Sequence, residues 1–168
     1  MATVHSFAPL QTPHARILIL GSMPGKASLA AGQYYAHPRN AFWPIMGEIF
    51  GFSAALPYEQ RVDRLLQHGI AVWDVARLCT RESSLDSDIV SSSVVANDFA
   101  QFFQNSPEIA RVCLNGAKAM ELYQRHVLRQ VPEAAERQAV RLPSTSPAYA
   151  GMPFETKLAH WREALGRQ

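Results

Sequence analysis

Residues 17–46 read ILILGSMPGKASLAAGQYYAHPRNAFWPIM and decide the fold of this chain. The apolar run at 17–20 is followed at once by Gly21, which is typical of a buried strand that ends in a tight turn. Open α/β sheets bind their ligands beyond the carboxyl ends of such strands. Tyr34, Tyr35 and the cluster His37–Asn40 come soon after the turn. We therefore expect this loop to hold a flat ligand at the edge of a parallel sheet.

Further apolar runs predict three more strands, with helical patterns between them. The expected strands cover 16–20, 69–75, 110–114 and 139–142, and the expected helices cover 40–50, 58–68, 99–105, 116–129 and 154–165. Strands that alternate with helices favour a parallel sheet with helices on both faces. We expect an α/β fold, a three-layer α/β/α sandwich around a central sheet of four mainly parallel strands.

The composition is that of an ordinary globular chain. With 168 residues and 48% hydrophobic content it can bury one core, and we expect a single domain over residues 1–168. The net charge of +2 suits a polyanionic partner but is also common among other enzymes. Cys79 and Cys113 form no CxxC pair, which favours reduced thiols in a cytoplasmic protein. No stretch has the pattern of a secretory leader or a membrane span, so no membrane is expected.

Two polar loops are expected after the second and fourth strands. Residues 80–93, TRESSLDSDIVSSS, are too polar for a core element, so Asp86 and Asp88 are interpreted as solvated carboxylates, while Asp74 could orient a site arginine. Residues 142–152, LPSTSPAYAGM, begin as the fourth expected strand ends. This last loop should reach the same sheet edge as the first loop.

The turn after the first expected strand is similar to a phosphate-binding loop, but its spacing is wrong. Three residues separate Gly21 from Gly25 where the nucleotide motif has four, and Ala27 stands where that motif has Ser or Thr. Pro24 also removes a backbone amide that could bind phosphate. Tight-turn packing is the structural alternative. No G-x-S-x-G elbow, HExxH pair or zinc-ligand spacing supports a serine hydrolase or a metalloprotease.

The residues after the turn favour contact with a nucleobase. Tyr34 and Tyr35 follow neither a strand nor a helix period, so at least one ring should face a cavity and could stack on a base. The Asn40 carboxamide both donates and accepts hydrogen bonds, as reading a base edge requires. Asn40 could equally cap the following helix, and the sequence does not separate the two roles. Phe42 and Trp43 begin a helical pattern and are expected in the core.

Together these segments resemble the uracil-DNA glycosylase superfamily, and within it the hypoxanthine-DNA glycosylase branch, sometimes called family 6. GSMPG followed by YYAHPRNAFW is similar to the first motif of that branch, WDV with SLDSDI to its middle segment, and LPSTSPAYA to its last motif. The resemblance implies that a base flips out of DNA into a pocket formed by the first and last motif loops.

The resemblance also implies roles for single residues. Met23 stands where related mismatch-specific enzymes carry an asparagine that positions water, whereas the hypoxanthine branch depends on an asparagine that matches Asn40. Tyr35 matches an aromatic that stacks on the base, and Tyr149, in place of the usual asparagine of SPANA, could wedge into the vacated stack. The predicted residues are Asn40 and Ser144 for catalysis; Ser22, Met23, Pro24, Gly25, Tyr35 and His37 for the base; and Arg39, Arg77, Arg81, Ser146, Pro147 and Tyr149 for DNA.

The implied reaction is hydrolysis of the N-glycosidic bond of a deaminated base in DNA, chiefly hypoxanthine, with uracil as a second candidate. We expect a monomer that binds DNA and needs no cofactor and no metal. We also expect no lyase step, because Lys26 is the one lysine in a site motif. Two alternatives remain open. They are a weakly catalytic DNA-damage binder, suggested by Met23 and Tyr149, and a hydrolase of free nucleosides.

Overall fold

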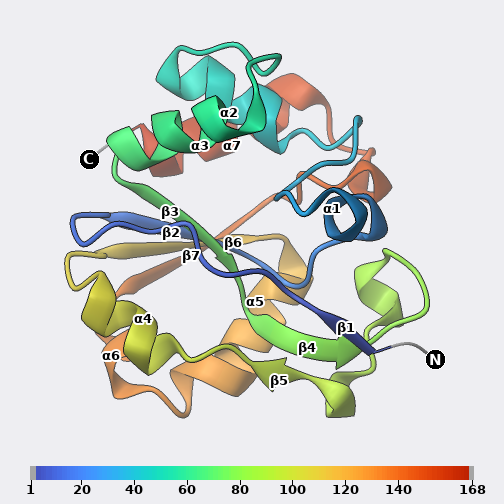
Figure 1. The fold of residues 1–168 in the computed structure, drawn as a ribbon, viewed down its shortest axis with the longest axis vertical. Helices are drawn as coiled ribbons and strands as arrows, with labels where there is room; N and C mark the ends of the chain where they lie inside the picture. Colours follow the sequence, from blue (N-terminus) through green and yellow to red (C-terminus); the bar gives the residue numbers. More distant parts are fainter. Residues whose placement is uncertain (1–2, 167–168) are drawn as a thin grey trace.

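A central parallel sheet organises the computed structural model, which describes residues 3–166 (Figure 1). Its four strands pair in parallel in the order β3-β2-β6-β7. They are β2 (Ile17–Gly21), β3 (Ile70–Asp74), β6 (Arg111–Asn115) and β7 (Gln138–Leu142). Every residue of β2 and β3 is buried, as expected for apolar strands with helices on both faces. The predicted strands are confirmed, with bounds that move by at most one residue.

Helices form a layer on each face of this sheet (Figure 1). One layer contains α2 (Phe42–Phe50), α3 (Tyr58–Gln67) and α7 (Phe154–Leu165), and the other contains α4 (Phe99–Asn105), α5 (Ala117–Tyr123) and α6 (Pro132–Ala135). Aromatic rings fill the core on both sides. Phe42 meets Trp161 edge to face at 6.3 Å, and Trp73 lies 5.0 Å from Phe99. The predicted α/β/α sandwich is confirmed, and Phe42 and Trp43 lie in its core.

Local chemistry explains where several helices begin and end. Asp98 caps α4 by accepting a hydrogen bond from Gln101 N at 3.0 Å. α2 begins at Phe42, with Pro44 in its first turn, where a missing N–H breaks no helical hydrogen bond. α5 ends at Tyr123 and continues as a π-helical turn, η3 (Gln124–Leu128). The sequence predicts one α-helix over 116–129, because apolar spacing does not distinguish a π turn from an α turn.

The sequence does not predict the second sheet, which is antiparallel with the order β1-β4-β5. Its strands are β1 (Thr3–His5), β4 (Ala76–Thr80) and β5 (Val95–Ala96). β4 follows β3 after Val75 alone, and the exposed Arg77 interrupts the apolar pattern that marks the other strands. The polar loop expected over 80–93 is present, with two 3₁₀ turns, η1 (Asp86–Asp88) and η2 (Ser91–Ser93).

The parallel strands bring their carboxyl ends to one edge of the sheet. Gly21, Asp74, Asn115 and Leu142 are the last residues of the four strands. The short helix α1 (Lys26–Ala31) lies beside this edge, together with η1 and η4 (Pro147–Tyr149) (Figure 1). Between residues 3 and 166, no helix combines the length and the apolar character that a membrane span requires.

Candidate active site

A cleft of about 1190 Å³ lies at this carboxyl edge. Three loops form most of its walls: the first loop (residues 22–25), the second loop (residues 81–88) and the last loop (residues 143–149), joined by residues 34–40. The predicted site residues that line it are Ser22, Met23, Pro24, Gly25, Tyr35, His37, Arg39, Asn40, Ser144, Ser146, Pro147 and Tyr149. The structure thus brings together residues from both ends of the chain, and leaves only Arg77 and Arg81 of the predicted set outside the lining.

All four residues of the first loop line the cleft. Gly21 precedes it because a Cβ there would lie 2.5 Å from Asp74 Oδ1 and 3.1 Å from the Tyr35 hydroxyl. The N–H groups of Ser22 and Met23 donate to no acceptor within residues 3–166. The Met23 side chain is buried and offers only a thioether. These two amides are therefore available to a ligand that carries negative charge.

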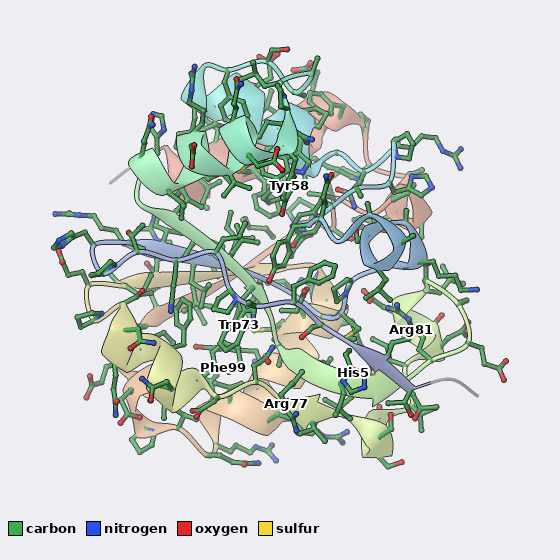
Figure 2. All side chains as sticks on the ribbon, viewed as in Figure 1. His5, Tyr58, Trp73, Arg77, Arg81 and Phe99 are labelled. Carbon is green, nitrogen blue, oxygen red and sulfur yellow. The ribbon has the colours of Figure 1, made fainter. Side chains whose placement is uncertain are left out.

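Two arginines predicted to contact DNA do not reach the cleft (Figure 2). Arg81 is buried, and its guanidinium donates a hydrogen bond to the carbonyl of Pro24. Arg77 is exposed, but it lies on β4 in the small sheet. Neither side chain lines the cleft, and contact of these two arginines with DNA stays a prediction. Arg81 instead joins the second loop to the first.

Two further hydrogen bonds join the second loop to the first loop and to the start of α1. Ser22 Oγ donates to Asp86 Oδ1, and Lys26 N donates to Ser84 Oγ at 2.8 Å. Asp86, interpreted from the sequence as a solvated carboxylate, is in fact part of the cleft wall. Burial raises the pKa of its carboxyl, and the hydrogen bond from Ser22 acts in the opposite direction. The wall between the two loops is therefore a bonded unit rather than a solvated surface.

Tyr34 and Tyr35 both line the cleft, and Tyr35 is the more exposed of the two. Tyr34 is buried and donates its hydroxyl to the Ala8 carbonyl at 2.8 Å. The Tyr35 ring stacks on Phe42, with 4.0 Å between centroids and 22° between planes, so one face is already covered. Its φ of 55° is a left-handed conformation that is uncommon for an aromatic residue. Its hydroxyl is buried beside the Asn115 side chain.

Asp74 lies on the floor of the cleft at the end of β3. It is 3% exposed, and Oδ2 has no hydrogen-bond partner among residues 3–166. Burial, and then the charge of Asp86, raises the pKa of Asp74 to about 7, against the opposing effect of Arg81. No ion pair joins Asp74 to an arginine within the described residues, so the expected orienting role is not seen. Asp74 instead offers the cleft a carboxyl that is partly protonated near neutral pH.

Asn40 uses only one end of its carboxamide within the protein. Oδ1 accepts a hydrogen bond at 2.9 Å from the N–H of Phe42, the first residue of α2, although the N-cap position itself is held by Ala41. Nδ2 makes no hydrogen bond to any described residue, and the side chain lines the cleft. Nearby, His37 Nδ1 accepts from Arg39 N at 3.1 Å, so the neutral imidazole carries its proton on Nε2. The two alternatives for Asn40, capping and contact with a ligand, are compatible in this geometry.

Asn115, which the sequence analysis does not select, holds the last loop in place. From the end of β6, its Oδ1 accepts from Thr145 N and its Nδ2 donates to Thr145 Oγ1, both at 3.0 Å. The Thr145 carbonyl accepts from Ala41 N at 2.9 Å, which joins the last loop to the start of α2. An asparagine directly after an apolar run and before Gly116 is the sequence signal that could have identified it.

The last loop places Ser144 inside the cleft and Tyr149 at its rim. Ser144 Oγ accepts a hydrogen bond from Ser146 N at 3.1 Å, which orients the hydroxyl. Tyr149 is 46% exposed. Lys157 Nζ donates to the Tyr149 carbonyl at 2.6 Å and lies 5.3 Å from the ring centroid. The Tyr149 ring is thus exposed to solvent, while Lys157 holds its backbone carbonyl.

Basic side chains from several elements surround the cleft. They are Lys26, Arg39, Lys118 and Arg141, of which the sequence analysis selects only Arg39 for DNA contact. Lys118 also pairs with Glu121 at 2.7 Å. Over residues 3–166, no group of three or more His, Cys, Asp or Glu side chains is arranged to hold a metal ion. The polar lining of the cleft suits a ligand with a carbonyl edge, and its rim suits phosphates.

Comparisons with known proteins agree with this arrangement. Residues 8–166 match the family described as the uracil DNA glycosylase superfamily. Hypoxanthine DNA glycosylases from Methanosarcina barkeri and Methanosarcina acetivorans are each 35% identical over 116 residues, which cover 68% of this chain and 72% of each relative. The solution NMR structure of a candidate uracil DNA glycosylase from Methanosarcina acetivorans has a TM-score of 0.78 and 31% identity, and the match covers 96% of this chain and 98% of that one. The chain therefore belongs to the uracil DNA glycosylase superfamily.

Proposed function

We propose that this DNA glycosylase hydrolyses the N-glycosidic bond of hypoxanthine in DNA, accepts uracil as a second base, and leaves an abasic site. One observation carries the proposal. The Tyr35 ring, the Asn40 carboxamide and the two unpaired amides of the first loop converge on one cleft at the sheet edge. The curated relatives at 35% identity are named hypoxanthine DNA glycosylases, which supports the choice of base.

Hydrogen-bond donors stabilise the charge that develops on the departing base. Breaking the glycosidic bond leaves positive charge on the sugar and negative charge on the base, so donors that face the base lower the barrier. Ser22 and Met23 line the cleft, and within residues 3–166 their N–H groups donate no hydrogen bond, so both are available to the base. Because Asn40 Oδ1 is occupied by Phe42 N, Nδ2 is the end that Asn40 presents to a ligand. We assign Asn40 to the departing base rather than to the water, since a donor does not help a water to attack.

Asp74 contributes to recognition in its protonated form. A neutral carboxylic acid presents a donor beside an acceptor, which complements the N1–H and C6 carbonyl of hypoxanthine and the equivalent edge of uracil. An ionised carboxylate would repel both the carbonyl and the charge that grows on the base. Asp74 is buried beneath the first loop with an unpartnered oxygen, and its pKa is raised to about 7. Protonation of Asp74 therefore favours the reaction.

The substrate is DNA that contains deaminated bases, bound by a cytoplasmic monomer. Flipping a nucleotide costs a few kcal/mol and is least costly at a mispair, which adds selectivity before the base meets the cleft. The buried, free thiols of Cys79 and Cys113 support the cytoplasmic placement, because reducing conditions keep cysteines in this form. We propose that the enzyme has no lyase step.

Direct detection of the released base tests the proposal. The purified protein is incubated with duplexes that carry one deoxyinosine, one deoxyuridine or no lesion, and with free inosine. Chromatography measures free base, and alkali converts abasic sites into strand breaks. We expect free hypoxanthine and alkali-dependent breaks at deoxyinosine, and neither product from the undamaged duplex. Tight binding without release would favour a damage-binding protein, and release from inosine but not from DNA would favour a nucleoside hydrolase.

A further inference from the structure

Two exposed apolar side chains stand at the rim of the cleft. Among residues 3–166, the exposed large hydrophobic residues are Leu85, Val95, Tyr149 and Phe154. Only Leu85 and Tyr149 line the cleft. Leu85 is 47% exposed and lies in a loop that is otherwise mostly polar, so it gives little to the core. An exposed apolar side chain at the edge of a cleft indicates contact with a bound partner.

The backbone of Leu85 is held at both of its polar groups. Its N–H donates to Ser83 Oγ at 3.0 Å, and its carbonyl accepts from Asp88 N at 3.1 Å. With both groups bonded, the residue enters η1 in a defined extended conformation. The loop therefore fixes the backbone of Leu85 and the direction of its Cα–Cβ bond.

One neighbour of Leu85 is hydrogen-bonded to the start of α1 and the other to the first loop. Ser84, which precedes it, accepts a hydrogen bond from Lys26 N at 2.8 Å. Asp86, which follows it, accepts one from the Ser22 hydroxyl. Leu85 thus lies between two hydrogen-bonded neighbours, and the partners of both, Lys26 and Ser22, line the cleft. A backbone held in this way favours insertion of the side chain into another molecule, because the loop does not yield when the two meet.

Leu85 and Tyr149 approach the cleft from opposite sides. The second loop follows β4, which continues from β3 at one edge of the parallel sheet, whereas the last loop follows β7 at the other edge. Both η1 and η4 lie beside α1 at the same side of the molecule (Figure 1). Lys26 and Arg39, which are exposed, line the cleft between them. The rim therefore combines two apolar side chains, which suit contact with stacked bases, with positive charges, which suit contact with the phosphates of DNA.

We propose that Leu85 is a second wedge, which enters the base stack of duplex DNA from the side opposite Tyr149 and keeps the target nucleotide out of the helix. Leucine is among the side chains that proteins insert between base steps. A wedge acts on the flipping step, which is required in a duplex and not in a single strand. The inference rests on the proposed function, because it assigns Leu85 to the same DNA substrate.

Single-turnover rates on matched substrates test this role. The variants are Leu85→Ala, Leu85→Met and, as a matched control, Val95→Ala, which shortens an exposed side chain outside the cleft. Each is assayed on one deoxyinosine strand, alone and in a duplex. We expect Leu85→Ala to slow release from the duplex by about tenfold and to leave the single-strand rate unchanged. Leu85→Met should keep most of the duplex rate, and Val95→Ala should match the wild type.

A fluorescent reporter separates failure of the wedge from failure of the proposed function. 2-Aminopurine beside the lesion brightens when its neighbour leaves the stack, whether or not the base is then released. If the wild type increases the 2-aminopurine fluorescence, Leu85→Ala increases it less, and neither protein releases a base, the wedge is supported and the proposed function is rejected. Equal losses on single and double strands would show that Leu85 only supports the loop. Wild-type duplex rates and brightening in Leu85→Ala would overturn the inference outright.

Discussion

The two ends of the Asn40 carboxamide face different partners. Oδ1 accepts from Phe42 N at the start of α2, while Nδ2 is left for the cleft. An alanine substitution removes both functions together, so its effect on activity alone does not distinguish capping from chemistry. The side chain that separates them is aspartate, which caps helices as well as asparagine does but has no donor.

Asn40→Asp should keep the stability of the protein and lose its activity. We expect the free energy of unfolding in urea to stay within about 0.5 kcal/mol of wild type, whereas Asn40→Ala should lose about 1 kcal/mol. Single-turnover release of hypoxanthine should fall on the order of a hundredfold in both variants, because a donor to the departing base is lost. Full activity in Asn40→Asp would assign the residue to capping alone.

At the scale of secondary-structure elements, the end of β3 carries Asp74, whose titration we expect to make the activity depend on pH. Asp74 is packed under Gly21, and Asp86, Arg81 and Tyr35 come toward it from other segments. Burial and the Asp86 charge raise its pKa to about 7. In the proposed mechanism the protonated form reads the base, so ionisation of Asp74 should slow the reaction.

Asp74→Asn should flatten the pH profile. For wild type, we expect kcat/KM on deoxyinosine duplex to fall as the pH rises through about 7, and for the variant, whose amide does not titrate, to stay level there. The stability of the fold should change with pH in the same direction as the activity, because the Asp74 carboxyl binds more protons in the folded state than in the unfolded state between about pH 4 and 7. Unfolding free energy should therefore decrease with rising pH over that range, and less so in the variant. Parallel profiles for both proteins would contradict this assignment.

Elements that carry a continuous apolar run were predictable from sequence, and those defined by a partner segment were not. The runs at 17–20 and 110–114 need only a buried sheet, and they became β2 and β6. β4 gains its place by pairing with β1 and β5, which its own residues do not indicate. Likewise, Arg81 reads as a surface cation until the Pro24 carbonyl is brought beside it. The same distinction applies at the site, where Asn115 acts through Thr145.

For the whole molecule, the position of charge matters more than the net charge of +2. Arg39 and Arg141 are exposed and line the cleft from opposite parts of the chain. Arg77 is equally exposed but lies on the small sheet, away from the lining (Figure 2). If DNA runs across the cleft, the first two arginines contact its phosphates and the third does not.

The salt dependence of binding tests the path of the DNA. Arg39→Ala and Arg141→Ala should each reduce the slope of log K against log salt concentration by about one, because each removes one phosphate contact. Arg77→Ala, with the same loss of charge, should leave the slope unchanged. Fluorescence anisotropy with an undamaged duplex measures all three without interference from base release. A reduced slope for Arg77→Ala together with wild-type slopes for the other two would show that DNA binds the small sheet and not the cleft. Leu85 and Tyr149, which lie at the rim of the cleft, would then have no base stack to enter.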